Sequence, residues 1–213
     1  MFYVYSGLDE SLNKNKDSNA QFIPKWSDAQ SIDRNSSEAE KCPSCGRSVT
    51  KTKWLPPRKI TLSNKRFPDR IGVWIMEPLV VSERVKQAYE REGLTGIHSF
   101  EPIEVVKVGR KIGAPSPQYY YAEISLSEKV RIDGEKSQIK KKWYDWTCDL
   151  CYPFNEEGNK CKILLKEDGN EEKDVFKLYS FGLTVFSEKF YQFVEKYNFT
   201  NFNLIPIDQY QLP

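Results

Sequence analysis

Two pairs of cysteines with the same spacing are the residues of this chain best suited to chemistry. Cys42 and Cys45 lie in "KCPSCGRSVTK", and Cys148 and Cys151 lie in "WTCDLCYP". Zinc prefers four thiolate or imidazole ligands in a tetrahedron, and a CxxC turn offers two sulfurs to one ion. The two pairs together would complete a closed four-cysteine site far more widely spaced in sequence than a local zinc ribbon. A closed site leaves no position for substrate, so the pattern predicts a structural Zn²⁺.

Other interpretations of the cysteines stay open at this point. A redox dithiol would be expected at a strand-to-helix junction, which the surrounding sequence does not indicate. The cysteines could also be two buried or disulfide-bonded pairs. The second motif has Tyr152 where Gly46 follows the first, which predicts a less regular second turn or a site that has lost its metal. The remaining cysteine, Cys161, is interpreted as a small core-facing strand residue.

The composition is that of a globular protein with nearly balanced charge. Of 213 residues, 39% are apolar and 14% aromatic, and 32 basic residues face 30 acidic ones, a formal net charge of +2. This balance argues against a protein built for non-specific nucleic-acid binding. No apolar run is long enough for a membrane span, and the start shows no signal-peptide pattern. We therefore expect a cytoplasmic protein, in which reduced, metal-binding cysteines are favoured over disulfides.

The elements that must position the cysteines are mostly strands. Alternating apolar residues predict strands in "MFYVYS", "RKITLS", "RIGVWIM", "IEVVKV", "QYYYAEISLSEKVRI", "KCKILLK", "DVFKLYSFGLTVF" and the tail "FNLIPIDQY". Two short helices are expected to start after the N-caps Ser82 and Ser187, and Gly93 is expected to end the first. The fold class predicted is α+β, with antiparallel sheets joined by hairpins and a few short helices.

The chain also repeats itself. Residues 81–95, "VSERVKQAYEREGLT", align with residues 186–200, "FSEKFYQFVEKYNFT", at an offset of 105 positions. The cysteine pairs and the later "PIE" and "PID" keep nearly the same frame. We therefore expect one domain, 1–213, of two related halves, about 41–110 and 147–213, joined by the zinc site and preceded by a strand and loop segment, 1–40. The alternative is chance similarity between two amphipathic helices, both of which need caps and an apolar stripe.

The sequence does not indicate catalysis. Its one histidine, His98, would have to serve any Ser-His or Cys-His scheme. No P-loop, G-x-G-x-x-G, G-x-S-x-G or H-E-x-x-H motif is present. A non-enzyme without catalytic residues is therefore expected.

Several longer stretches carry a family resemblance. They are "MFYVYS", "CPSCG", "RFPDRIGVW", "LVVSERVKQAYEREGLTGIHSFEPIEV" and "DVFKLYSFGLTVFSEKFYQFVEKYNFTNFNL", together with the second cysteine pair. In these the chain resembles the bacterial double-CXXCG motif family, although CDLCY replaces CxxCG in the second motif. The resemblance implies an immunity protein, encoded beside a polymorphic or contact-dependent toxin, that binds this toxin in the cytosol and blocks it. It also implies zinc binding by the cysteines, and it carries over no catalytic residue.

Two function hypotheses follow from these observations. An immunity protein acting by steric occlusion would need aromatic anchors at its interface, for which Tyr119, Tyr121, Trp143 and Trp146 are candidates. The alternative interpretation of the same residues is that they pack in the core or on the metal turn. The second hypothesis is a zinc-knuckle nucleic-acid binder, because "SQIKKKWYDW" mixes lysines with aromatic residues. The near-neutral total charge makes a nucleic-acid partner the less favoured one.

Overall fold

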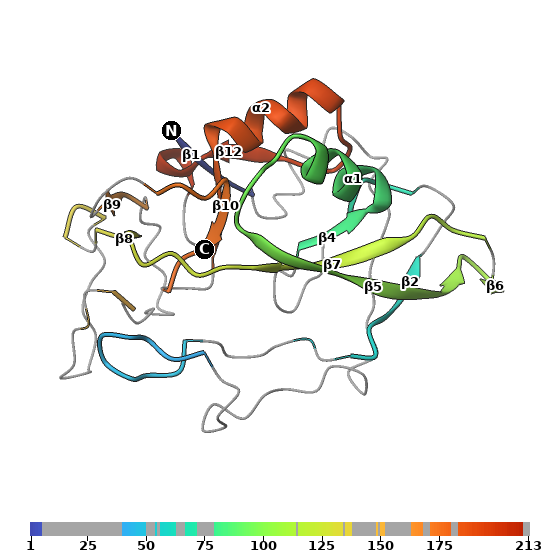
Figure 1. Cartoon of the computed structure of the whole chain (residues 1–213), viewed down its shortest axis with the longest axis horizontal. Coiled ribbons are helices and arrows are strands. Elements are labelled where there is room, and N and C mark those ends of the chain that lie inside the picture. Colours follow the sequence, from blue (N-terminus) through green and yellow to red (C-terminus); the bar gives the residue numbers. More distant parts are fainter. Residues whose placement is uncertain are drawn as a thin grey trace.

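The computed structural model describes residues 1–5, 40–49, 54, 56–62, 67–71, 79–113, 115–133, 135–137, 148, 150–151, 163–167, 171–179 and 183–210. These residues form strands and two α-helices, so the predicted α+β class is confirmed (Figure 1). In chain order the elements are β1 (Phe2–Tyr5), β2 (Lys59–Leu62), β3 (Arg70–Ile71), β4 (Leu79–Ser82), α1 (Glu83–Arg91), β5 (Ile97–Val108), β6 (Lys111–Ile112), β7 (Tyr119–Ile124), β8 (Val130–Ile132), β9 (Leu165–Glu167), β10 (Val175–Lys177), β11 (Thr184–Ser187), α2 (Glu188–Tyr197), β12 (Leu204–Pro206) and a 3-10 helix (Ile207–Gln209).

Both helices begin where the sequence predicts. The hydroxyl oxygens of Ser82 and Ser187 accept hydrogen bonds from the N–H groups of Val85 and Phe190, at 3.4 and 3.1 Å. An acidic residue follows each cap, where the helix dipole favours negative charge. Gly93 follows the C-cap of α1 with φ of +61°, as expected of a helix-ending glycine. Among the described residues, neither helix is long and apolar enough to cross a membrane.

The strands form three sheets. One sheet has the order β10-β11-β1-β12, and a larger one has the order β2-β5-β7-β4-β3 with β6 paired to β5. Strands β8 and β9 pair with each other. The pairings are antiparallel, as predicted, except that β2 runs parallel to β5. Strands that follow each other pair as expected in β5–β6 and β10–β11, but the central pairings join strands distant in sequence, such as β1 with β11 and β4 with β7.

The central strands of the two larger sheets occupy equivalent positions. In one sheet Tyr120 of β7 lies opposite Val81 of β4 and Pro102 of β5. In the other, Tyr3 of β1 lies opposite Phe186 of β11 and Pro206 of β12. Strand β1 therefore lies in a sheet built otherwise from the C-terminal half of the chain. Strand β7, which follows the first helix and β5, completes the sheet of the N-terminal half.

Three apolar clusters form the core. The largest lies under both helices and includes the buried stripe of each helix, which the sequence predicted, together with one face of each larger sheet. The second covers the opposite face of the β4–β7–β5 sheet and contains Trp54, Ile60 and Tyr119. The third covers the opposite face of the β11–β1 sheet and contains Val4, Phe176 and Ile163. The central strands of each larger sheet, β4 and β7 in one and β1 and β11 in the other, are thus covered on both faces.

Matching hydrogen bonds cross between the two halves. Asp69, directly before β3, accepts bonds from the N–H and hydroxyl of Thr200 after α2, at 2.9 and 3.1 Å. Asp174, directly before β10, accepts bonds from the same groups of Thr95 after α1, at 2.9 and 3.2 Å. Each carboxylate also accepts a bond of 3.0 Å from the N-cap serine of its own half. The aspartates are only 6% exposed, so these bonds are shielded from water.

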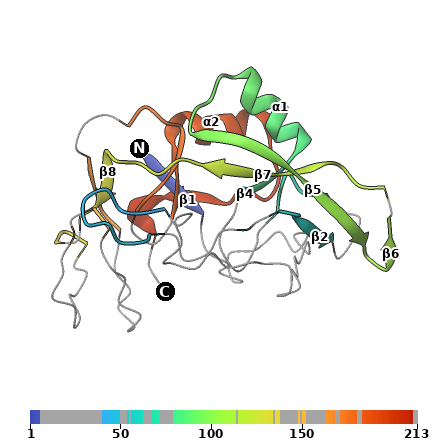
Figure 2. The ribbon, with the colours of Figure 1, turned by 60° about the horizontal axis from the view of Figure 1, so that its bottom comes forward.

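The described loop at residues 40–49 and the β5–β6 hairpin lie at opposite ends of the molecule. Both views place β6 at one extremity and β8, with the loop beside it, near the other (Figures 1 and 2). The cysteine turns and the hairpin are therefore separate features of the surface.

Candidate metal centre

The first cysteine turn is a small closed loop. The N–H of Gly46 donates to the carbonyl of Cys42 at 2.8 Å, and the N–H of Cys42 donates to the carbonyl of Arg47 at 2.7 Å. Gly46 has a φ of +71°, a conformation that favours glycine. These bonds fold the backbone around the side chain of Cys42, whose thiol also accepts hydrogen bonds from the N–H groups of Ser44 and Cys45.

The second turn uses the same bonds without a following glycine. The N–H groups of Leu150 and Cys151 donate to the thiol of Cys148, as those of Ser44 and Cys45 do to Cys42. Both turns thus point two backbone N–H groups at the sulfur of their first cysteine. Asp149 and Tyr152 lie outside the described residues, so the irregularity expected from the CDLCY sequence stays a prediction.

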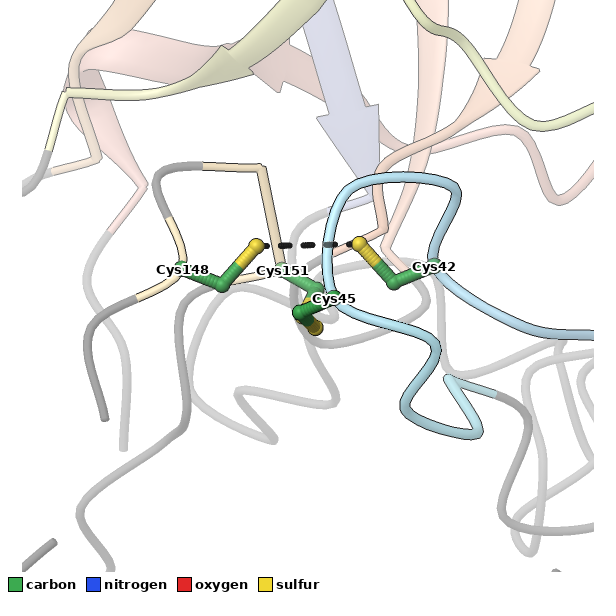
Figure 3. Close-up of side chains that lie close together, drawn as sticks. All are labelled: Cys42, Cys45, Cys148 and Cys151. Atoms are coloured by element: carbon green, nitrogen blue, oxygen red, sulfur yellow. Dashed lines mark hydrogen bonds between the residues drawn. The ribbon is translucent and has the colours of Figure 1, made fainter. Parts of the chain in front are cut away.

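The two turns meet and bring four sulfur atoms together (Figure 3). All four Sγ atoms lie within 4.8 Å of one another. Cys42 lies 3.7 Å from Cys148, and Cys45 lies 3.3 Å from Cys151, so each closest pair joins the two halves of the chain. A disulfide requires about 2.05 Å between sulfurs. The four thiols are therefore free.

This donor set fits a tetrahedral thiolate site. Four sulfurs at about 2.3 Å from a zinc ion would lie roughly 3.8 Å from one another. The two sulfur–sulfur distances of 3.7 and 3.3 Å lie at or below this value, and the upper limit of 4.8 Å for every sulfur pair lies above it. Four soft sulfur ligands favour zinc over hard cations such as Mg²⁺ or Ca²⁺, which prefer oxygen. The cluster is compatible with a metal held by Cys42, Cys45, Cys148 and Cys151.

The electrostatics of the cluster are uneven in the absence of a cation. Burial opposes ionisation of Cys148, but bonds from the N–H groups of Cys151 and Leu150 and from the Ser44 hydroxyl outweigh it and lower the thiol pKa to about 6. Burial raises the pKa of Cys42, and burial together with hydrogen bonds to Cys45 raises that of Cys151. Four thiolates this close would repel one another. A divalent cation would remove this cost and allow all four to ionise.

Accessibility differs within each pair of cysteines. Cys42 is 1% exposed and Cys151 is 4% exposed, whereas Cys45 is exposed and Cys148 is half-buried. One cysteine of each turn is therefore buried, whereas the other reaches the surface of the molecule. A metal bound by all four would keep no open position for a substrate, which suits a stabilising role and not a catalytic one.

One contributor to the site was not predicted from the sequence. The hydroxyl of Ser44 donates a hydrogen bond to the thiol of Cys148, so a residue of the first turn supports a sulfur of the second. The hydroxyl inside "CPSC" was the available signal. Its partner could be identified only once the two turns were known to meet.

Two of the four aromatic residues expected at an interface, Tyr119 and Tyr121, are among the described residues. Tyr119 and Tyr121 are 0% and 5% exposed and belong to the cluster on the outer face of the β4–β7–β5 sheet. This burial fits the alternative interpretation, in which the two tyrosines pack in the core, and an interface role for them stays a prediction. Trp143 and Trp146 lie outside the described residues, as does Cys161.

The single histidine is part of a local contact. His98 Nε2 lies 2.9 Å from Ser125 Oγ. Ser125 is 7% exposed, and its hydroxyl also lies 3.2 Å from the carbonyl oxygen of Gly96, to which it can donate. A serine nucleophile would have to reach a substrate. This buried hydroxyl instead ties β5 to the segment after β7.

Comparison with known proteins connects this arrangement to a family. A family model described as "Immunity protein family (Imm11)" matches residues 13–209, nearly the whole chain and both cysteine pairs. The match confirms the immunity-type relationship that the sequence motifs implied. No curated protein matches the chain.

Proposed function

Because the chain belongs to the Imm11 immunity protein family, we propose that it binds a cognate toxin protein in the cytoplasm and neutralises it by occluding the toxin's active surface. The family match is the observation that carries this proposal. An immunity protein of this kind needs a stable surface complementary to the toxin and no chemistry of its own. Its inhibition would then be stoichiometric, one chain for one toxin molecule.

The side-chain arrangement supports binding without catalysis. The described residues place the one histidine against a buried hydroxyl. The four cysteines are arranged as a closed donor set. A metal held by all four sulfurs would keep no open position for a substrate, and the Ser125 hydroxyl beside His98 is too buried to act as a nucleophile. Catalytic inhibition, such as hydrolysis of the toxin, would require an accessible reactive group.

We further propose that the cysteine cluster binds one structural Zn²⁺. Cys42, Cys45, Cys148 and Cys151 would hold the ion, and it would stabilise the contact between the two turns. Each closest sulfur pair takes one cysteine from either half of the chain, so the ion would link segments that are remote in sequence. Metal binding of this kind adds to the free energy of folding and not to a chemical step.

The direct test uses the toxin encoded by the neighbouring gene. The purified full-length chain and the purified toxin domain should form a one-to-one complex with nanomolar affinity by calorimetry. Co-expression should restore growth of cells that produce the toxin, in proportion to the amount of complex. A matched toxin domain from an unrelated system should bind at least a thousandfold more weakly, because immunity is specific.

The alternative, nucleic-acid binding, predicts a different pattern. The chain would then retard generic DNA or RNA duplexes in a salt-dependent manner and would leave the toxin unbound. That result, or growth rescue that persists when no complex forms, would contradict the proposal.

A further inference from the structure

The two halves differ most clearly where β5 and β12 end. Both strands pair with the central strand of their sheet through an equivalent proline, Pro102 or Pro206. Strand β12 ends at that proline and continues as a 3-10 helix, whereas β5 runs on to Val108 and turns back as β6. The segment Lys107–Gly113, here called the hairpin arm, therefore has no counterpart among the described residues that follow β12.

The base of the hairpin arm is firmly held. Lys107 lies opposite Ile112 in the ladder, and Val108, only 3% exposed, anchors the arm in the core. The N–H of Gly109 donates to the carbonyl of Leu62 at 2.7 Å, and that of Gly113 donates to the carbonyl of Val106 at 3.1 Å. An arm held in this way is preorganised, so little conformational entropy would be lost when it binds a partner.

The hairpin arm carries exposed cations next to an exposed apolar side chain. Ile112 is 84% exposed, the highest value among the large apolar residues that the structure describes. Arg110 and Lys111 are exposed beside it, Lys107 is half-buried, and no acidic residue occurs between positions 105 and 113. Within the described part of the chain, none of these three cations has an ion pair or side-chain hydrogen bond. The arm also projects at one end of the molecule (Figures 1 and 2).

We propose that the hairpin arm docks on an acidic surface of the toxin and inserts Ile112 into an apolar recess there. The inference rests on the proposed function and names the part of the surface that would perform it. An exposed aliphatic residue with cations beside it in sequence and opposite it in the ladder fits an interface with an apolar centre and a charged rim. Uncompensated positive charge would steer association with an acidic partner and speed complex formation.

Two alternative roles for the hairpin arm fit its residues less well. A nucleic-acid surface would pair cations with aromatic side chains for base stacking, and the hairpin arm has none. A lysine on an edge strand also discourages strand-to-strand aggregation. That role would account for Lys111, but the isoleucine beside it is 84% exposed, and an exposed apolar residue on an edge strand favours aggregation.

The test compares variants of the full-length chain in their binding to the toxin domain encoded by the neighbouring gene. We expect Ile112→Asp to weaken binding at least tenfold, because a charge would enter the apolar recess. Arg110→Glu combined with Lys111→Glu should also weaken binding at least tenfold, chiefly by slowing association at low salt. Lys166→Glu, an exposed reversal on β9 near the opposite end, serves as the matched control and should bind as the unmodified chain does.

The possible outcomes separate this inference from the function on which it rests. If the unmodified chain binds the toxin and both arm variants bind equally well, the docking inference is wrong and the proposed function stands. If the unmodified chain does not bind the toxin, both are wrong. A salt-dependent shift of labelled DNA or RNA duplexes that disappears in the double charge reversal would assign the arm to nucleic acid and overturn the inference. Unchanged thermal unfolding of each variant would exclude misfolding as the cause of a loss.

Discussion

The N-terminal and C-terminal halves of this chain use the same contacts at a constant offset of 105 positions. Asp69 and Asp174, Ser82 and Ser187, and Thr95 and Thr200 form matching hydrogen bonds. The strands before the helices also pair in the same register, with Arg70 opposite Val81 and Val175 opposite Phe186. We propose that the halves are copies of one ancestral unit, because chance similarity of two helices would not extend to strand register and crossed bonds.

The comparison also suggests where each copy begins. Tyr3 of β1 and Tyr120 of β7 occupy equivalent positions in opposite sheets. Each copy would then start with its aromatic strand, continue through its cysteine pair and end with β5 or β12. In this interpretation the first strand of each copy lies in the sheet of the other copy. The crossed Asp–Thr bonds and the four sulfurs add two further attachments between the copies.

What the copies do not share is equally informative. The features common to both, the capped helix, the buried aspartate and the cysteine turn, all contribute to holding the molecule together. Among the described residues, a hairpin arm occurs after β5 and not after β12. Features that hold the fold together therefore recur in the described halves, whereas the arm that we propose for docking does not. The predictions below test whether equivalent residues are energetically equivalent.

The largest effect is expected at the metal centre. Replacing Cys42 with Ser or Cys148 with Ser should abolish binding of one zinc ion per chain, since each removes one of four ligands. Each change should lower the free energy of unfolding by about 3–5 kcal/mol. The double variant should lose no more than either single one, because both act through the same ion. Metal content and denaturant unfolding, with and without a strong chelator, measure these effects.

Cys161→Ser provides the control for this experiment, since the sequence analysis assigns that thiol to the core and not to the metal. It should retain one zinc ion per chain and the sensitivity to chelator. Equal stability of the unmodified chain with and without chelator would show that the four sulfurs are merely packed. Additive losses in the double variant would argue against a shared ion.

A smaller effect is expected from the crossed aspartates. In Asp69→Asn and Asp174→Asn the new side chain has nearly the shape of the old one. It places an amide donor or a weaker acceptor against the N–H and hydroxyl groups of Thr200 and Thr95. Each should cost about 2–3 kcal/mol, because buried N–H and hydroxyl donors lose their charged acceptor. Replacing Asp69 should lower the free energy of unfolding slightly more than replacing Asp174. Arg84 lies 2.9 Å from Asp69, whereas Lys189 lies 3.5 Å from Asp174. Denaturant unfolding at neutral pH compares the two.

Thr95→Val and Thr200→Val sharpen this comparison by removing only the hydroxyl partner from the other half. Both should cost less than the aspartate changes, since the backbone N–H bond remains. A twofold or greater difference between the two aspartates would contradict energetic equivalence of the copies. The common origin of the two copies would then depend on their matching strand register alone.

The sequence was most informative where the structure is local. The helix starts depend on Ser82 and Ser187 and on apolar residues three and four positions apart, all within one segment. The two CxxC turns likewise predicted a four-sulfur cluster, because each turn offers two sulfur ligands and zinc binds four. The helix starts and the individual turns could be predicted since the interactions that create them lie within a few residues along the chain, whereas the cysteines that meet across the two turns are 106 positions apart.

Long-range pairing could not be predicted in the same way. Nothing in "FYVYS" specifies that β1 pairs with β11 and β12, since a strand reveals its apolar faces and not its neighbours. The same limit applies at Tyr119 and Tyr121. The face that carries them continues with the polar residues Glu123 and Ser125, as in a strand with one exposed face, yet two separate clusters cover both faces of this strand. Burial of the second face depends on segments remote in sequence.

The smallest predicted effect concerns a tyrosine–glutamate pair that also occurs twice. The hydroxyl of Tyr3 donates to Glu188 at 2.8 Å, at the start of α2. Tyr120, in the equivalent position, donates to Glu83 at the start of α1, and this bond is the main cause that lowers the pKa of the Glu83 carboxyl. The same bond raises the pKa of Tyr120 to about 12.

The lowered pKa of Glu83 fixes the sign of the pH dependence. A carboxyl whose pKa is lower in the folded than in the unfolded chain stabilises the fold above its ordinary value of 4.5, and this contribution is lost as pH falls through the folded pKa. Tyr120→Phe should therefore cost less than about 1 kcal/mol at pH 7, since Glu83 is only partly buried. It should also flatten the loss of stability below pH 4.5. Tyr3→Phe should cost a similar amount if the copies are equivalent.

Carboxyl titration by NMR, with denaturant unfolding at several pH values, measures this effect. Glu195→Gln, an exposed charge removal on α2, should leave the Glu83 titration unchanged. A Glu83 pKa that stays low in Tyr120→Phe would show that the remaining contributions, Gln87 and Lys86 of its own helix, suffice to hold it down. In that case Tyr120 would contribute to stability through packing and not through its bond to Glu83. The Tyr120–Glu83 and Tyr3–Glu188 pairs would then share their geometry but not an electrostatic contribution.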